Sequence, residues 1–185
     1  MLAWGWGNRA YIVEREYLCE IIARARTATG SILECGSGLS TLVAGALIDG
    51  SETTLYALEH DAHWYERICD VVDNFNLRNV RPVYAPLQDF GAFSWYDVRG
   101  AGLPRDISLV LCDGPPGSTR GGRYGLLPVM RGHLLPGALV LVDDCKRAEE
   151  RDIVDRWIKE FDGSLTKMGG TRFPYAVVTI SPGRA

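Results

Sequence analysis

Cysteine and long hydrophobic runs are scarce in this chain. Five of its 185 residues are cysteines, an odd number, and no CxxC pair occurs. Such spacing argues against a disulfide framework and against a zinc knuckle. No apolar run reaches the length of a membrane span, and the N-terminus lacks a signal-peptide pattern. We therefore expect a cytoplasmic protein with no membrane partner.

An excess of basic charge is also missing. The chain carries 20 Lys and Arg against 23 Asp and Glu, a formal net charge of −3, without a long basic run. This balance does not favour binding to a nucleic-acid backbone. The length suits one domain with a proper core, and no repeat or linker interrupts the sequence. We predict a single domain over residues 1–185, in which residues 1–30 form an N-terminal arm and a helix.

The most informative segment runs from Ser31 to Thr41 and reads SILECGSGLST. It predicts a buried strand, a glycine turn and the start of a helix. Gly36 and Gly38 permit a tight turn and a close approach of the backbone to a ligand. Ser40 and Thr41 fall where the backbone N–H groups of the new helix are free. Such a segment is typical of a pocket for a nucleotide or a carboxylate at the carboxyl edge of a parallel sheet.

Strand-like and helical patterns alternate along the rest of the chain. We predict strands over residues 31–35, 53–59, 80–84, 106–112, 138–142, 164–168 and 173–180. Helices are predicted over residues 9–29, 39–49, 62–75 (with Asp61 as N-cap), 124–135 and 148–161, and residues 85–103 are predicted to be loop. This alternation indicates a parallel sheet with helices on both faces. The last two strands leave no room for a crossover helix, so we expect them to pair antiparallel.

Two glutamates indicate which cofactor this edge would hold. Glu59 ends the second predicted strand, 23 residues after Gly36, where an acid can accept both hydroxyls of an adenosine ribose. The sequence departs from the dinucleotide-binding pattern G-x-G-x-x-G, because Thr41 occupies the position of the last glycine. Glu34 would repel a pyrophosphate but would tolerate an ammonium or a sulfonium. These residues favour a positively charged cofactor over NAD.

Four parts of the sequence together resemble the class I S-adenosylmethionine-dependent methyltransferases. They are the segment ILECGSG, the Glu59 position, the segment LVLCDGPPG and the segment LLPGALVLVDD. The resemblance implies a three-layer, Rossmann-like α/β fold with a seven-stranded, mostly parallel sheet. Its strand order would be 3-2-1-4-5-7-6, with an antiparallel last strand.

The resemblance also implies the residues that bind S-adenosylmethionine. The glycine turn would lie against the methionine part, the end of the second strand would hold the ribose, and residues 85–89 would lie near the adenine. Asp113, at the end of the fourth strand, would lie beside the methyl group. The implied set is Glu34, Gly36, Ser37, Gly38, Ser40, Thr41, Glu59, His60, Leu87 and Asp113.

Three aspartates are expected to converge at the same edge. Asp113 ends the fourth predicted strand, and Asp143 and Asp144 end the adjacent fifth strand. Carboxylates this close need a cation, a shared proton or hydrogen-bond donors. One interpretation is a site for Mg²⁺ or another hard divalent ion, as in the metal-dependent O-methyltransferases that this arrangement resembles. The other is that one aspartate caps a helix and another accepts from loop N–H groups.

We predict an S-adenosylmethionine-dependent methyltransferase that O-methylates a small-molecule or carbohydrate-like acceptor, with Asp113 and Asp143 as catalytic residues. Arg120 and Arg123 either contact the substrate or belong to a solvated loop. Two alternatives stay open: an NAD-type oxidoreductase, and a methyltransferase-like module that binds cofactor without catalysis. The sequence would also allow a homodimer.

Overall fold

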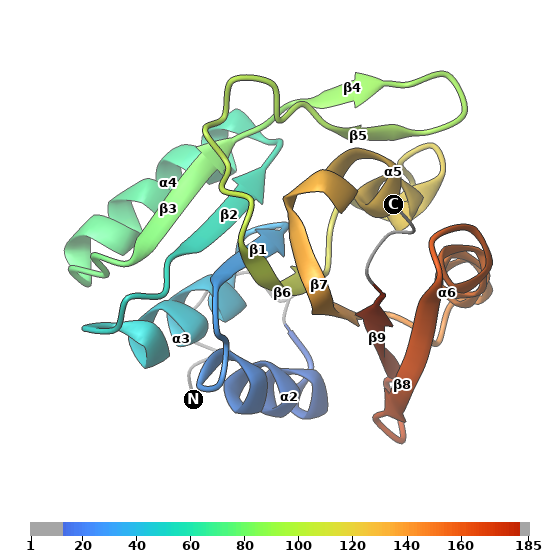
Figure 1. Ribbon diagram of the computed structural model, residues 1–185. Coiled ribbons are helices and arrows are strands. Elements are labelled where there is room, and N and C mark those ends of the chain that lie inside the picture. Colours follow the sequence, from blue (N-terminus) through green and yellow to red (C-terminus); the bar gives the residue numbers. More distant parts are fainter. Residues whose placement is uncertain (1–12, 182–185) are drawn as a thin grey trace.

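A seven-stranded, mostly parallel sheet forms the centre of the structure, a computed structural model that describes residues 13–181 (Figure 1). The strand order is β3-β2-β1-β6-β7-β9-β8. β9 is the one strand of this sheet that runs in the opposite direction to the other six. With the short strands β4 and β5 left out of the numbering, this is the predicted order, which is therefore confirmed. The seven strands are β1 Ser31–Cys35, β2 Leu55–Glu59, β3 Val80–Tyr84, β6 Ile107–Cys112, β7 Leu134–Val142, β8 Gly163–Gly169 and β9 Tyr175–Ile180.

The strand register aligns the carboxyl ends of three adjacent strands. Cys35 at the end of β1 lies opposite Cys112 at the end of β6, and Cys112 lies opposite Val142 at the end of β7. The residues that follow these strands, including Asp113 and Asp143, therefore emerge side by side at one edge of the sheet. That edge is where open α/β sheets bind ligands.

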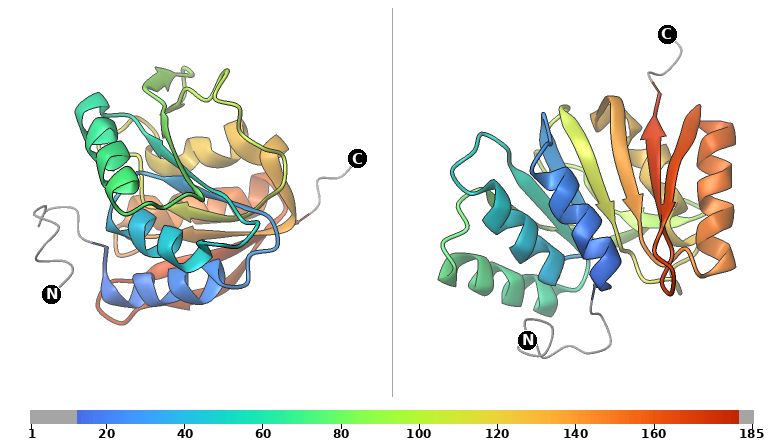
Figure 2. Two further views of the ribbon diagram at one scale, coloured as in Figure 1. Left: turned by 90° about the vertical axis from the view of Figure 1, so that its left-hand side faces the viewer. Right: turned by 90° about the horizontal axis from the view of Figure 1, so that it is seen from below.

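Helices cover both faces of the sheet (Figure 2). One face carries α2 Arg15–Ala25, α3 Leu39–Ile48 and α4 Ala62–Asn74, and the other carries α5 Leu126–Met130 and α6 Ala148–Glu160. Alternate strand residues enter opposite cores: Ile32 packs with the first group of helices, and Leu33 packs with the second. Because both faces are covered, β1 is buried along its whole length. No helix within residues 13–181 is long and apolar enough to span a membrane.

The ends of the chain differ in part from the prediction. The first helix was expected over residues 9–29, but the described helix α2 covers only Arg15–Ala25. Residues 9–12 and the predicted N-terminal arm lie outside the described residues. The terminal strands pair antiparallel as predicted. The side chain of Asp61 accepts from the backbone N of Trp64 at 2.7 Å, so the predicted N-cap of α4 is confirmed.

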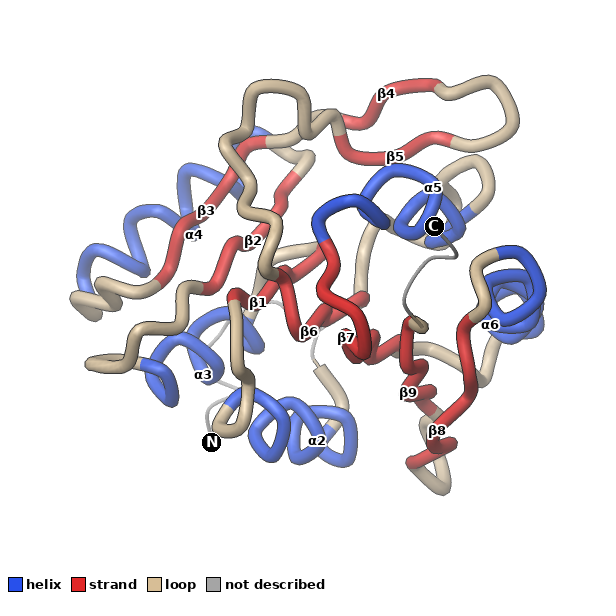
Figure 3. The backbone as a smooth tube through the Cα atoms, viewed as in Figure 1, coloured by secondary structure: helices blue, strands red, loops and turns tan. Residues whose placement is uncertain are grey.

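The prediction was wrong in two internal segments. Residues 85–103 contain an antiparallel hairpin of β4 Leu87–Asp89 and β5 Ser94–Tyr96. The predicted helix over 124–135 is shorter: α5 lies between two 3-10 turns, and β7 already begins at Leu134. Figure 3 shows α5 and β7 close together along the chain. Leu134 pairs with Ile107, and regular pairing resumes from Leu139 after a register shift. Tertiary strand pairing thus outweighs the helical preference of this stretch.

Candidate functional site

The turns that follow β1 and β6 touch each other backbone to backbone. Gly36 has a φ of +87°, and a Cβ atom there would lie 3.2 Å from Cα and N of Gly114. A Cβ atom on Gly114 would lie 2.4 Å from the hydroxyl oxygen of Tyr96 and 3.0 Å from the carbonyl oxygen of Cys35. Glycine is therefore required at both positions, and the contact holds the turn after β1 against the turn after β6.

Glu34 is buried beneath the start of α3. Its Oε2 atom accepts a hydrogen bond from Oγ1 of Thr41 at 2.5 Å. The Oγ1 atom of Thr41 accepts in turn a hydrogen bond from the backbone N of Gly38 at 2.8 Å. Its Oε1 atom has no hydrogen-bond partner in the described part of the chain. Burial raises the pKa of Glu34 to about 8, although hydrogen bonds from Ser40 and Thr41 oppose this shift. The predicted residues Glu34, Ser40 and Thr41 thus form one buried cluster, and a single acceptor atom is left unused.

Glu59, at the end of β2, accepts four hydrogen bonds. Oε2 accepts from N and Oγ of Ser37 at 3.2 and 2.8 Å, and Oε1 accepts from the backbone N of His60 and of Asp61 at 2.8 and 3.0 Å. Burial would raise the pKa of Glu59, but the His60 imidazole, whose Nδ1 atom lies 3.0 Å from Oε1, and the hydrogen bonds from Asp61 and Ser37 outweigh it and lower the pKa. These hydrogen bonds hold the glycine turn against the second strand, and they bring Ser37 and Glu59, two residues of the predicted cofactor site, into contact.

The hairpin of β4 and β5 adds residues that the sequence analysis missed. Trp95 and Tyr96 of β5 are fully buried, and neither the Trp95 indole N–H nor the Tyr96 hydroxyl has a hydrogen-bond partner among residues 13–181. The Tyr96 ring meets His60 edge-on with centroids 6.2 Å apart. Leu87 of β4 packs on the same core. The aromatic run before residue 97 was the signal that could have indicated a strand here.

Arg123 is the central group among the strand-end carboxylates. Its Nη2 atom lies 2.8 Å from Oδ2 of Asp144 and 3.1 Å from Oδ1 of Asp113. The structure therefore brings these two aspartates together as predicted, but a guanidinium lies between them. No group of three or more His, Cys, Asp or Glu side chains in the described residues is arranged to hold a metal ion. The predicted Mg²⁺ site at Asp113, Asp143 and Asp144 is not supported, because Arg123 supplies the cation.

Asp143 lies beside this cluster and is nearly buried. Its Oδ1 atom accepts from the backbone N of Asp144 at 2.8 Å, which agrees with the alternative that one aspartate accepts from a loop N–H group. Asp144 has a φ of +61°, a left-handed conformation that turns the chain back after β7. Burial, aided by the charge of Asp113, raises the pKa of Asp143 to about 7. A carboxyl group with such a pKa can both release and take up a proton near neutral pH.

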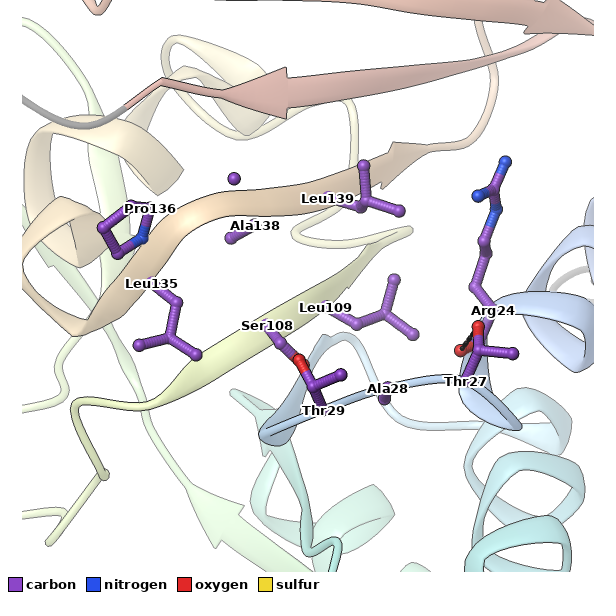
Figure 4. Close-up of a pocket in the computed structure, with 11 residues that line it drawn as sticks. Arg24, Thr27, Ala28, Thr29, Ser108, Leu109, Leu135, Pro136, Ala138 and Leu139 are labelled. Atoms are coloured by element: carbon purple, nitrogen blue, oxygen red, sulfur yellow. Dashed lines mark hydrogen bonds between the residues drawn. The ribbon is translucent and has the colours of Figure 1, made fainter.

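A pocket lies at the opposite, amino edge of the sheet (Figure 4). It has a volume of about 170 Å³ and is bounded by the loop after α2 and by the first residues of β6 and β7. None of the predicted site residues lines it. The groups able to bind or react therefore gather at the carboxyl edge, away from this pocket.

No protein-family model matches the chain, and no curated protein matches it in sequence. Solved structures do match. A Staphylococcus aureus protein provisionally named caffeoyl-CoA O-methyltransferase superposes with a TM-score of 0.75 at 14% identity, over 96% of this chain and 89% of that one. A methyltransferase from Geobacter sulfurreducens gives 0.69 at 14% identity, over 97% and 86% of the two chains. An RNA methyltransferase from Salinibacter ruber, solved with S-adenosyl-L-homocysteine, gives 0.60 at 12% identity, over 95% and 97%. The chain therefore has the Rossmann-like fold of the S-adenosylmethionine-dependent methyltransferases.

Proposed function

We propose that this protein is an S-adenosylmethionine-dependent methyltransferase that methylates an oxygen atom of a small-molecule or carbohydrate-like acceptor. The observation that carries the proposal is the cradle between the turns after β1 and β6. The two turns are in backbone contact, and a Cβ atom on the neighbouring Gly38 would meet open space. Tyr96 Oη, beside Gly114, and Oε1 of Glu34, near the end of β1, are buried and have no hydrogen-bond partner among residues 13–181. Buried polar atoms without partners are rare in folded proteins, and a ligand is one reason for them.

The charges of this cradle suit a cationic cofactor. Glu34 and Glu59 both lie at the carboxyl edge. Glu59 is ionised because its pKa is lowered, whereas burial raises the pKa of Glu34 to about 8, so that a nearby ammonium or sulfonium would favour loss of the Glu34 proton. Oε1 of Glu34 is free to accept a hydrogen bond from an amino group. The ionised carboxylate of Glu59 would repel a pyrophosphate, which disfavours the NAD-type alternative. The residues present therefore fit S-adenosylmethionine.

Ribose binding would require a rearrangement at Glu59. Each carboxylate oxygen of Glu59 already accepts two hydrogen bonds, and both hydrogen bonds on Oε2 come from Ser37. Hydroxyl groups of a ribose would replace the Ser37 donors on Oε2, while the backbone N–H groups of His60 and Asp61 keep Oε1 in place. Binding of the cofactor would thus free Ser37 from Glu59, while the backbone N of Gly36 keeps its hydrogen bond to the carbonyl oxygen of Leu58 in β2.

Proton transfer is the task we assign to the strand-end aspartates. When bound, S-adenosylmethionine supplies a methyl group on a sulfonium sulfur. Asp113 and Asp143 follow directly after adjacent strands, and a carboxylate there can take the proton from an acceptor hydroxyl. Holding the two reactants in line supplies much of the rate acceleration in such a displacement. The net charge of −3 and the absence of a basic run support a small acceptor over RNA.

Calorimetric titration with S-adenosylmethionine, S-adenosylhomocysteine and NAD⁺ tests the cofactor. We expect micromolar binding of the first two and none of NAD⁺. Transfer of a labelled methyl group to a panel of hydroxylated small molecules then tests the reaction. Binding without turnover over a broad panel would favour the non-catalytic module, and tight NAD⁺ binding would overturn the proposal.

A further inference from the structure

The Arg123 guanidinium joins three elements at the carboxyl edge of the sheet. Arg123 lies in the 3-10 turn Gly122–Gly125, just before α5. Its Nη2 atom donates to the carbonyl oxygen of Asp113 at 2.5 Å, and Nη1 donates to the carbonyl oxygen of Asp143 at 2.5 Å. Nε lies 3.7 Å from Oε1 of Glu150 in α6. One side chain therefore spans the ends of β6 and β7 and the start of α6.

This guanidinium cannot leave its place readily. Only 1% of the Arg123 side chain is exposed, so swinging it outward would break its contacts with two main-chain carbonyls and two carboxylates. A guanidinium also stays protonated throughout the pH range of proteins. Its planar fork suits simultaneous contacts with several oxygen atoms. Arg123 is thus a permanent, buried positive charge.

Two arginine side chains already pair with the carboxylates at this position. A second guanidinium, that of Arg147, lies 2.9 Å from Oδ2 of Asp144 and 3.9 Å from Oε1 of Glu150. Two arginines therefore face the carboxylates of Asp113, Asp144 and Glu150. A Mg²⁺ ion between Asp113 and Asp144 would have to displace Nη2 of Arg123 and would lie beside two positive charges.

We infer that Arg123 is the resident counter-ion of this edge, that it positions Asp113 and Asp144, and that methyl transfer proceeds without a divalent metal ion at these residues. The statement about catalysis rests on the proposed function; the statement about the counter-ion does not. Arg123 is a positioning residue, because it acts through the carboxylates it holds.

Binding of Mn²⁺, followed by electron paramagnetic resonance, tests the counter-ion directly and needs no activity. We expect no stoichiometric Mn²⁺ site in the wild-type protein up to millimolar ion. Stoichiometric binding that disappears in Asp144→Asn would overturn the inference. In parallel, methyl transfer should be unchanged by EDTA; loss of turnover on chelation with recovery on adding Mg²⁺ would also overturn it.

Substitution of Arg123 provides the second test. Arg123→Met removes the charge at similar length, which leaves the carboxylates without their cation, so a Mn²⁺ site should appear and kcat should fall about tenfold or more. Arg123→Lys keeps the charge and should keep Mn²⁺ out while recovering part of kcat. Arg99→Met is the matched control, since the exposed side chain of Arg99 pairs with Asp97 alone among the described residues. A purely structural Arg123 would lower the melting temperature of Arg123→Met without creating a Mn²⁺ site, and that result would contradict the inference.

Failure of the two proposals can be told apart. If S-adenosylmethionine does not bind, the proposed function fails, and Mn²⁺ binding still decides what Arg123 does. If Arg123→Met does not fold, the role of Arg123 is decided by Mn²⁺ binding to the wild-type protein and by Mn²⁺ binding and kcat of Arg123→Lys. If the cofactor binds and turnover needs Mg²⁺, the function stands and the inference about Arg123 is wrong.

Discussion

The hydroxyl oxygen of Ser37 lies 2.8 Å from Oε2 of Glu59, and this contact ties the glycine turn after β1 to the end of β2. Ser37 thus donates to the atom that we assign to a ribose hydroxyl. The contact therefore competes with the proposed cofactor, and substitutions of its two partners should act in opposite directions.

Ser37→Ala should strengthen S-adenosylmethionine binding by about 0.5–1.5 kcal/mol, the net worth of one hydrogen bond that the cofactor no longer has to break. The free protein should lose a similar amount of stability. Calorimetry and urea unfolding of the same preparation measure the two effects. Weaker cofactor binding in Ser37→Ala would mean that this hydroxyl contacts the cofactor itself.

Glu59→Ala should weaken S-adenosylmethionine binding by about 2–4 kcal/mol, because a carboxylate that accepts two ribose hydroxyls is lost. The exposed residue Glu66 of α4 offers a matched control in Glu66→Ala, which should leave the dissociation constant unchanged. Circular dichroism should verify that Glu59→Ala stays folded, since Glu59 also accepts four protein hydrogen bonds. An unchanged dissociation constant would remove Glu59 from the ribose site.

Glu34 should make the protein less stable as pH rises. Its pKa is raised by burial to about 8, so the folded state keeps a proton that the unfolded state releases from about pH 4.5 upward. The free energy of unfolding should then fall between about pH 4.5 and 8, by at most about 1.4 kcal/mol per pH unit from this group, and level off above pH 8. Glu34→Gln should flatten that slope in urea titrations at pH 5 and 8.5. An identical slope in Glu34→Gln would show that other groups carry the pH dependence.

Gly114→Ala should destabilise the protein by about 1–3 kcal/mol, because the new methyl group meets the Tyr96 hydroxyl and the Cys35 carbonyl in a packed interior. Adding Tyr96→Phe removes the nearest atom and should restore part of the loss. Gly132→Ala is a suitable control, as no heavy atom lies within 4 Å of its added Cβ. Thermal unfolding of the three single variants and of the double variant Gly114→Ala, Tyr96→Phe gives the coupling energy between positions 114 and 96. If the free-energy changes of the two single variants simply add, the assigned contact is wrong.

Glu20 should stabilise the attachment of α2 to the last two strands above acid pH. Its Oε2 atom accepts from Nζ of Lys167 at 2.5 Å and from Oη of Tyr175 at 2.9 Å, and Oε1 accepts from Nε of Arg24 at 2.8 Å. Burial opposes ionisation, but these hydrogen bonds outweigh it and lower the pKa of Glu20. Glu20→Gln should therefore cost about 1–3 kcal/mol at pH 7. The difference from wild type should shrink as pH falls through the lowered pKa, and a pH-independent difference in urea unfolding would contradict this account.

Local patterns predicted the strands, the parallel sheet and the antiparallel end, and the resemblance to the class I methyltransferases implied the order of the strands. Five strand–helix alternations and a terminal hairpin leave few topologies, because parallel crossovers are right-handed and short connections join neighbours. The end of the predicted helix at residues 124–135 was wrong for a tertiary reason. Leu134 pairs with Ile107 of β6, and no local pattern encodes a partner 27 positions away.

The sequence by itself determined which residues end the strands, and so it located Glu34, Gly36, Glu59, Asp113 and Asp143 at one edge. The tertiary structure alone decided how those residues are neutralised and covered. Tyr96 reaches Gly114 only because the β4–β5 hairpin folds over the site, and Arg123 reaches Asp113 and Asp144 from a turn between them in the chain. Periodicity reports which face of an element is buried, whereas the pairing of charges depends on distances between elements that exist only after the chain has folded.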